Sequence, residues 1–456
     1  MKKGFFVFGF LLLISPVFAV YNRLGIPDSS EIRKDLEESW LTAPLDFVRS
    51  NLAEIRYNDN GMPFQVKLEE NESIYYISVS PESDMDIDVH TNDEVVVENQ
   101  KIYPIDGIGS WVLIKDKKTD SPLRIRYYFL KDSDVYIQFS PGNNDVALVD
   151  LIIFGNYAAR RVTTGVPFEK FYTASFEDVI KFTENKIPWN YVLYDTDMYH
   201  SIKQMCAVIR EKLPDMTIVK DAMYNGNNEL VHITTGEKFD DDDLKNIAET
   251  SGLILSSAGF VKWICDGLIE PLTGGMLKRE PLMQETISVK DTGRQGVLSQ
   301  NYDLFFGLNW IRNIASAVIS VYSGSTYLFN QSGVDVTINP FASSITKKGV
   351  ANIVTFIENT GYNVHVLRSL MYVLAATEPG TFYLGAIRET DRTVSPEIKV
   401  YNKCVSFFPY FQDDGGFACS VFMDGKEMSL DEFYNSFKDD FVFLTRVKSS
   451  EQFFPY

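Results

Sequence analysis

Histidine and cysteine are scarce in this sequence, with four of each among 456 residues. The acidic run Asp240 to Asp243 lacks the alternation of ligands and the terminal glutamate that a calcium loop needs. His232 is flanked by apolar residues on a predicted strand, which favours a structural role over that of a base. We therefore expect no metal and no cofactor. The four histidines lie far apart in the sequence: His90, His200, His232 and His365.

The few cysteines do not form the framework of a disulfide-rich domain. Cys206 and Cys265 lie in segments with the apolar spacing of buried helices, where a free thiol behaves as a small hydrophobe. Cys404 and Cys419 flank a predicted hairpin that turns at an Asp-Asp-Gly-Gly sequence. That turn places Cys419 opposite Tyr410 and separates the two sulfurs by about 20 Å, too far for a bridge. We expect no disulfide.

Basic residues are also in deficit. Lysine and arginine number 43 against 62 aspartate and glutamate residues, a formal net charge of −19. Nucleic acids and anionic lipid surfaces are bound by lysine and arginine patches. The charge balance therefore argues against both as partners, and no nucleic-acid partner is expected.

Long apolar runs are missing except near the N-terminus. Met1-Lys2-Lys3 precedes an apolar run from Phe5 to Ile14, which is too short to span a bilayer, and small or apolar residues follow up to Ala19. This pattern is typical of a secretory signal peptide over 1–19, with the mature chain beginning at Val20. No transmembrane segment is expected after its removal. The protein is predicted to be periplasmic or secreted.

The region 20–165 begins with a helical segment and then becomes rich in short strands. Its strands are β-branched or aromatic and are separated by Gly, Pro, Asn and Asp clusters, which predicts an antiparallel β-sandwich. Trp111, Tyr127, Tyr128 and Tyr136 could stack on sugar rings, but a core or cross-strand role is favoured.

The region 166–456 mixes helices with strands, so the chain as a whole is predicted to be α+β. Its best-marked helix lies at 253–271. Two hydroxyl side chains suited to N-capping, Ser256 and Ser257, precede apolar residues at helical spacing, and Pro271 is expected to end the helix.

The segment 256–263 reads Ser-Ser-Ala-Gly-Phe-Val-Lys-Trp. It resembles the Asp-Cys-Ser-Gly-Phe-Val-Lys-Trp motif of NlpC/P60-type cysteine peptidases. In that family the cysteine lies at a helix N-terminus, where the helix dipole favours the nucleophilic thiolate. Here Ser257 occupies the cysteine position and Ser256 the aspartate position. The resemblance covers 166–444 and implies a papain-like domain that has lost its nucleophile.

The same family takes its catalytic histidine from a strand that follows the cysteine helix, and a polar residue on the next strand orients the imidazole. The resemblance places the histidine position at Lys403, within one residue, so Asn402, Lys403 and Cys404 are the candidates. None of them is histidine. Ser420 is the nearest polar match on the next strand, and the catalytic set is expected to be degenerate at Ser257, Lys403 and Ser420.

A serine and lysine dyad of Ser257 with Lys403 stays open as an alternative. It needs a neutral lysine, whereas an ordinary lysine pKa is about 10.4 and an acidic chain favours the charged amine. A helix predicted from Phe305 through Val321 is expected to pack near the site helix. The candidates for a binding groove are Ser256, Ser257, Lys262, Trp263, Trp310, Arg312 and Lys403, with core packing as the alternative for Trp310 and Arg312.

The sequence thus predicts a protein of the bacterial envelope whose inactive NlpC/P60-like domain binds a peptidoglycan stem peptide or an envelope protein. One alternative is a working cell-wall hydrolase that uses Ser257 with Lys403, or a Cys404 thiolate. Another is a structural or assembly protein that recognises its partner through the β-sandwich.

Overall fold

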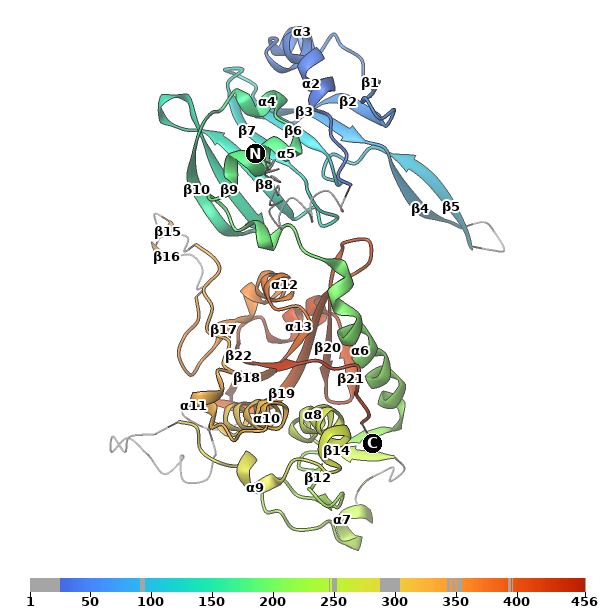
Figure 1. Cartoon of the computed structure of the whole chain (residues 1–456), viewed down its shortest axis with the longest axis vertical. Coiled ribbons are helices and arrows are strands. Elements are labelled where there is room, and N and C mark those ends of the chain that lie inside the picture. Colours follow the sequence, from blue (N-terminus) through green and yellow to red (C-terminus); the bar gives the residue numbers. More distant parts are fainter. Residues whose placement is uncertain are drawn as a thin grey trace, which may run out of the picture. The chain divides into compact units, whose positions relative to one another are not determined.

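The computed structural model describes residues 25–90, 95–245, 247, 252–287, 304–342, 345–346, 349–350, 355–392, 395 and 397–455. The predicted signal peptide and Val20 lie outside these residues. The chain divides into two compact units (Figure 1). The first comprises Met1–Ile152 and Tyr157–Asp195, and the second comprises Ile153–Asn156 and Thr196–Tyr456. The contacts thus group 166–195 with the strand-rich first unit.

The first unit is built on an eight-stranded sheet. Its strands follow the order β1-β2-β3-β6-β7-β8-β9-β10, and a separate pair is formed by β4 and β5. The pairings from β1 to β8, and the pair β4 and β5, are antiparallel, so the predicted antiparallel character of this region is confirmed. The eight strands form one continuous hydrogen-bonded sheet and not the two packed sheets of the predicted sandwich. The strand bounds are β1 (Glu54–Tyr57), β2 (Pro63–Glu70), β3 (Ile74–Pro81), β4 (Ser83–His90), β5 (Val95–Ile102), β6 (Trp111–Asp116), β7 (Pro122–Tyr127), β8 (Val135–Pro141), β9 (Val146–Ile153) and β10 (Asn156–Pro167).

Short helices pack on this sheet through a buried arginine. The helices are α2 (Ser30–Asp35), α3 (Leu45–Val48), α4 (Lys170–Thr173) and α5 (Phe176–Thr183). Arg33 donates to the carbonyl oxygens of Tyr172 and Ala174, both at 2.8 Å, and its guanidinium lies 5.1 Å from the ring of Trp111. Trp111 and Tyr127 are fully buried. The expected core role of these two aromatic residues is confirmed.

The other two aromatic candidates of this region lie together. Tyr128 is buried, and Tyr136 is half-buried with its ring 5.6 Å from that of Tyr128. The guanidinium of Arg126 covers the Tyr136 ring at 4.6 Å. The two tyrosines therefore form the expected cross-strand contact.

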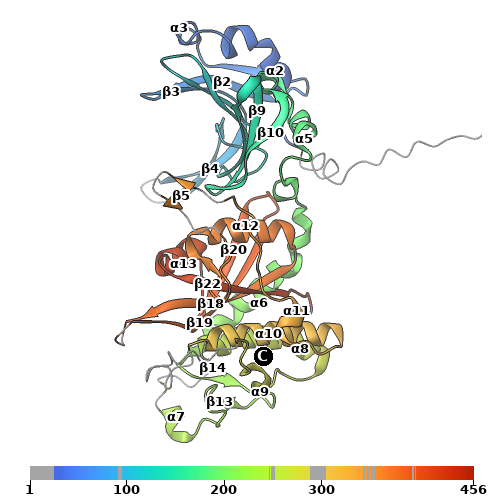
Figure 2. The same cartoon turned by 90° about the vertical axis from the view of Figure 1, so that its left-hand side faces the viewer.

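The second unit contains a six-stranded antiparallel sheet in the order β17-β22-β18-β19-β20-β21. Helices α8 and α10 lie on one face of it, and α12 and α13 lie on the other (Figures 1 and 2). The α+β class predicted from the sequence is confirmed. The bounds are β17 (Tyr362–Asn363), β18 (Thr381–Asp391), β19 (Ile398–Phe411), β20 (Phe417–Met423), β21 (Lys426–Met428), β22 (Phe441–Lys448), α8 (Ser257–Thr273), α10 (Phe306–Ser323), α12 (Leu367–Thr377) and α13 (Leu430–Phe437).

Smaller elements precede and connect these layers. They include β11 (Met216–Ile218), which pairs in parallel with β14 (Leu253–Leu255) directly before α8. The others are α6 (His200–Lys212), β12 (Met223–Tyr224), β13 (Leu230–Val231), α7 (Asp241–Lys245), α9 (Arg279–Leu282), α11 (Phe329–Ser332), β15 (Ile345–Thr346) and β16 (Gly349–Val350). Among the described residues, no helix combines the length and apolarity needed to cross a membrane.

Helix α8 begins where the sequence predicts. Ser256 is its N-cap, and the Ser256 hydroxyl accepts the N–H of Gly259 at 3.1 Å. This bond satisfies one of the N–H groups that a helix start leaves without a partner.

The predicted end of α8 at Pro271 is wrong. The helix continues to Thr273, and Gly274 closes it in a left-handed conformation. A proline lacks the N–H that would bond four residues back, here to the carbonyl of Gly267. That carbonyl instead accepts the N–H of Phe454 at 2.9 Å. A segment distant in the sequence thus compensates for the proline.

The four cysteines are free, as expected. The hairpin between β19 and β20 forms, but Cys419 lies opposite Pro409 and not Tyr410. The predicted register is therefore wrong by one residue, because the sequence alone does not fix where the turn is centred.

Candidate functional site

The predicted site lies where the N-terminus of α8 meets strand β19. Ser257 is the first residue of α8, and its hydroxyl accepts the N–H of Cys404 at 2.8 Å and donates to the carbonyl of the same residue at 2.9 Å. The pairing of β19 with β20 begins at Ser406 with Phe422, so Cys404 lies beyond the end of that ladder. The Ser257 hydroxyl therefore satisfies the backbone N–H and carbonyl of Cys404, which a neighbouring strand would otherwise satisfy.

Asp424 is a member of this site that the sequence reasoning missed. It follows β20, has a positive φ of 51° and is half-buried. Burial raises the pKa of its carboxyl group, while the nearby Lys403 charge and a hydrogen bond with Ser257 act in the opposite direction. The Asp-Gly pair at 424–425 signalled a turn, but nothing local indicated that the turn would reach Ser257.

Lys403 faces away from α8. Side chains alternate between the two faces of a strand, and the Lys403 ammonium lies 5.3 Å from the ring of Phe437 on α13. It also forms an ion pair of 3.0 Å with Glu389. Cys404 instead belongs to the apolar core that contains the α8 side chains. Of the three candidates for the histidine position, Cys404 is the one directed towards α8.

Neither cysteine nor serine chemistry is favoured by these surroundings. Cys404 is fully buried, and burial raises the pKa of its thiol, which stays protonated at neutral pH. The Ser257 hydroxyl is bonded to a backbone amide and a backbone carbonyl rather than to an imidazole. A serine without a general base is a poor nucleophile.

The third expected polar position, Ser420, lies away from Ser257. Ser420 is opposite Phe408, four residues along β19 from Cys404, which corresponds to about 13 Å. Its hydroxyl accepts from Arg210 of α6 at 2.9 Å. Ser420 therefore contributes to a different surface, a cavity of about 350 Å³ beside α6.

Most of the expected groove residues are part of the core. Ser256, Lys262, Trp263, Trp310 and Arg312 each expose less than a twentieth of their surface. The Lys262 ammonium contacts Asp266 at 2.6 Å and the carbonyl of Tyr224 at 2.8 Å, and the indole of Trp310 donates to the carbonyl of Ala258 at 2.9 Å. Only Ser257 and Lys403, of the seven candidates, keep substantial exposure.

The histidines whose side chains the structure describes have other surroundings than Ser257. His232 stacks on Phe239 and lies 3.2 Å from Asp243, which agrees with its expected structural role. His200 is exposed at the start of α6, and the His90 side chain lies outside the described residues. Within the described part of the second unit, no histidine hydrogen bonds to Ser257.

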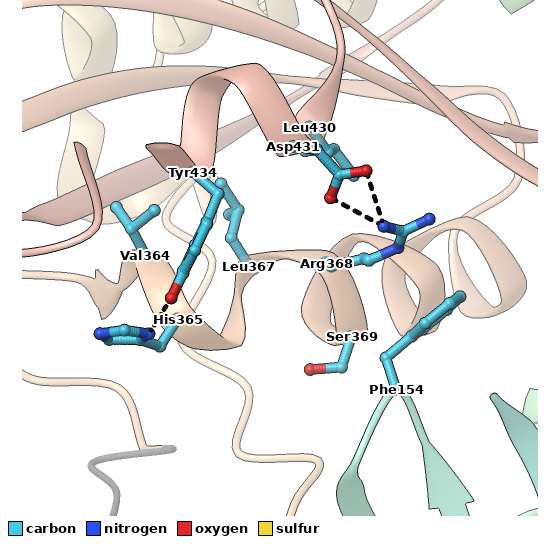
Figure 3. Close-up of a pocket in the computed structure, with 9 residues that line it drawn as sticks. All are labelled: Phe154, Val364, His365, Leu367, Arg368, Ser369, Leu430, Asp431 and Tyr434. Atoms are coloured by element: carbon cyan, nitrogen blue, oxygen red, sulfur yellow. Dashed lines mark hydrogen bonds and ion pairs between the residues drawn. The ribbon is translucent and has the colours of Figure 1, made fainter. Parts of the chain in front are cut away.

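His365 instead lines a separate cavity of about 210 Å³ between α12 and α13 (Figure 3). Its Nδ1 lies 3.0 Å from the hydroxyl of Tyr434. On the same wall, one nitrogen of Arg368 contacts both carboxylate oxygens of Asp431, at 2.8 and 3.1 Å. Each ionisable group in this cavity thus has a partner within it.

Comparison with known proteins adds one match. Residues 22–191 match the family model of a domain of unknown function, DUF8515. Apart from Ile153–Asn156, this range belongs to the strand-rich first unit, and it ends close to the boundary of that unit at Asp195. No curated protein and no solved structure matches the chain.

Proposed function

We propose that this is an envelope protein, periplasmic or secreted, whose second unit is a degenerate NlpC/P60-like domain that binds a peptidoglycan stem peptide without cleaving it. The observation that carries the proposal is the position of the Ser257 hydroxyl and its hydrogen bonds to the backbone. Its hydroxyl lies at the helix N-terminus where the motif places the nucleophile, and it is hydrogen bonded to the backbone N–H and carbonyl of Cys404.

The charged groups around Ser257 support binding over catalysis. Asp424 hydrogen bonds with the half-buried Ser257 hydroxyl, and the charges of Lys403 and Glu389 act on the Asp424 carboxyl group, although the Lys403 side chain faces α13. A stem peptide carries carboxylates and an amine, so a site of mixed charge is complementary to it. Binding contacts of this kind do not require a thiolate.

The first test measures turnover and binding with one protein, residues 20–456. We expect no release of peptides from purified peptidoglycan, and co-sedimentation with it. Peptidoglycan from which an amidase has removed the stem peptides is the matched control. Loss of co-sedimentation with that control supports stem recognition, and unchanged co-sedimentation overturns it. Release of peptides by the wild-type protein would show a working hydrolase.

Two rebuilt variants examine the site geometry. Ser257→Cys with Lys403→His should remain inactive, because residue 403 faces α13 and cannot deliver a base to residue 257. Ser257→Cys with Cys404→His is the matched comparison, since residue 404 faces α8. Cleavage by the Lys403→His pair, measured as muropeptide release, would contradict the assignment of these two faces.

A further inference from the structure

A large cavity of the second unit, separate from the Ser257 site, includes Arg312 of α10 in its lining. It has a volume of about 980 Å³ and is bordered by α10, α11, β22 and the segments 286–287, 333–337 and 356–359. This volume is at the upper end of the range for small-molecule sites. An isolated bridge between Asp335 and Thr445 joins one of these segments to β22, so the wall is tied to the sheet.

The two arginines of this cavity already face carboxylates. Arg312 donates to both carboxylate oxygens of Asp335, at 3.1 and 2.8 Å, and its guanidinium covers the ring of Phe443 at 4.5 Å. Arg446 donates to both carboxylate oxygens of Glu378, at 3.0 and 3.1 Å. An incoming anion would have to displace one of these bidentate pairs. The cavity is therefore poorly suited to an anionic ligand.

One carboxylate of the cavity, that of Glu358, has no partner among the residues that the structure describes. Glu358 lines it and is exposed, and within the ranges that the structure describes no hydrogen bond or ion pair engages its side chain. Phe356 and Phe329 line the cavity with it and offer apolar surface. Around the cavity there are therefore three carboxylates and two guanidinium groups. The carboxylates are those of Asp335, Glu358 and Glu378, of which Glu378 is the partner of Arg446. An acidic chain of net charge −19 adds a long-range attraction for cations.

We propose that this cavity binds a primary amine carried on an aliphatic stem, as in a lysine-type side chain. The ammonium pairs with Glu358, and the methylene groups lie against Phe356 and Phe329, because such stems pack on apolar surface while the charged end stays polar. The proposal concerns a site other than Ser257 and does not depend on the proposed function.

The test uses the whole chain and Nα-acetyl-L-lysine amide as the probe. Ligand-observed saturation-transfer NMR should show binding in the millimolar range, as suits a single ion pair with modest apolar contact. The same compound acetylated on its side-chain nitrogen is the uncharged control and should bind at least about fivefold more weakly. Absence of transfer to the lysine probe, or equal binding of both compounds, overturns the proposal.

A pair of variants separates the local contact from the overall charge. Glu358→Gln should weaken binding of the lysine probe about fivefold and remove the preference over the acetylated compound. Glu211→Gln removes the same charge from the exposed surface of α6, outside the cavity lining, and should leave binding unchanged. An equal loss in both variants would mean that the probe senses only the net charge, and the site assignment would fail.

Discussion

Replacement of Lys262 by methionine tests whether this lysine is a core residue or a groove residue. Lys262 and Asp266 form an ion pair inside α8 with 1 % and 5 % of their side chains exposed. The carboxylate also accepts the N–H of Leu277 at 2.9 Å. Removal of the lysine leaves a buried carboxylate with that single donor.

The expected loss of unfolding free energy is about 3–5 kcal/mol, the usual cost of removing one partner from a buried pair. Burial already raises the pKa of the Asp266 carboxyl in the wild-type protein, against the opposing effect of Lys262. Without the lysine, the folded-state pKa lies further above the unfolded one. The folded variant then binds a proton that the unfolded chain releases, so its deficit should shrink as the pH falls.

The assay is urea unfolding at pH 8 and pH 5, followed by near-ultraviolet circular dichroism. The double variant Lys262→Met with Asp266→Asn should recover all but about 1 kcal/mol, because the amide oxygen keeps the Leu277 contact and no charge is buried. Lys245→Met is the control, since Lys245 is exposed and pairs with Asp242 on the surface; it should change stability by less than about 0.5 kcal/mol. A Lys262→Met variant as stable as this control would refute the core assignment.

Two further perturbations probe other parts of the chain. Hydrogen bonds from Arg49 and an ion pair with Lys117 lower the pKa of Glu70 to about 2. The stabilisation by Glu70 should therefore be complete above about pH 4.5 and be lost as the pH falls to about 2. The wild-type protein should be about 1 kcal/mol more stable than Glu70→Gln at pH 7, and this difference should disappear at about pH 2. Equal differences at pH 7 and pH 2 would contradict this. Gly267→Ala places a methyl group 2.8 Å from the Phe453 ring and 2.9 Å from the backbone nitrogen of Pro455, so it should cost about 1–3 kcal/mol in thermal or urea unfolding. An unchanged midpoint would show that the segment 453–455 shifts to make room.

The start of α8 and the class of the fold could be read from the sequence. Ser256 and the Gly259 N–H that it accepts are three residues apart, so the capping contact is encoded locally. The strand-rich first half and the α+β second half likewise follow from the period of the apolar residues. The aromatic residues Trp111 and Tyr127 were correctly assigned to the core by the same reasoning.

The environment of the candidate site depended on contacts between distant segments. Ser257 meets Cys404 across 147 positions of sequence, and Asp424 reaches Ser257 from the turn between β20 and β21, at an even greater distance along the chain. Neighbouring residues on β19 face opposite sides of the sheet, so a prediction that is uncertain by one residue cannot tell which face the position has. The structure shows that Lys403 faces α13 and that Cys404 faces α8.

The sequence by itself determined the features whose signals are local, such as the capped start of α8 and the periods of the apolar residues. It also showed the scarcity of histidine and cysteine. Only the tertiary structure decided which side chains are accessible. Lys262 and Arg312 are polar in the sequence but buried in the fold, because carboxylates from Asp266 and Asp335 meet them there. A distant contact also explains why α8 continues past Pro271. The N–H of Phe454 donates to the Gly267 carbonyl, and no local pattern predicts this hydrogen bond.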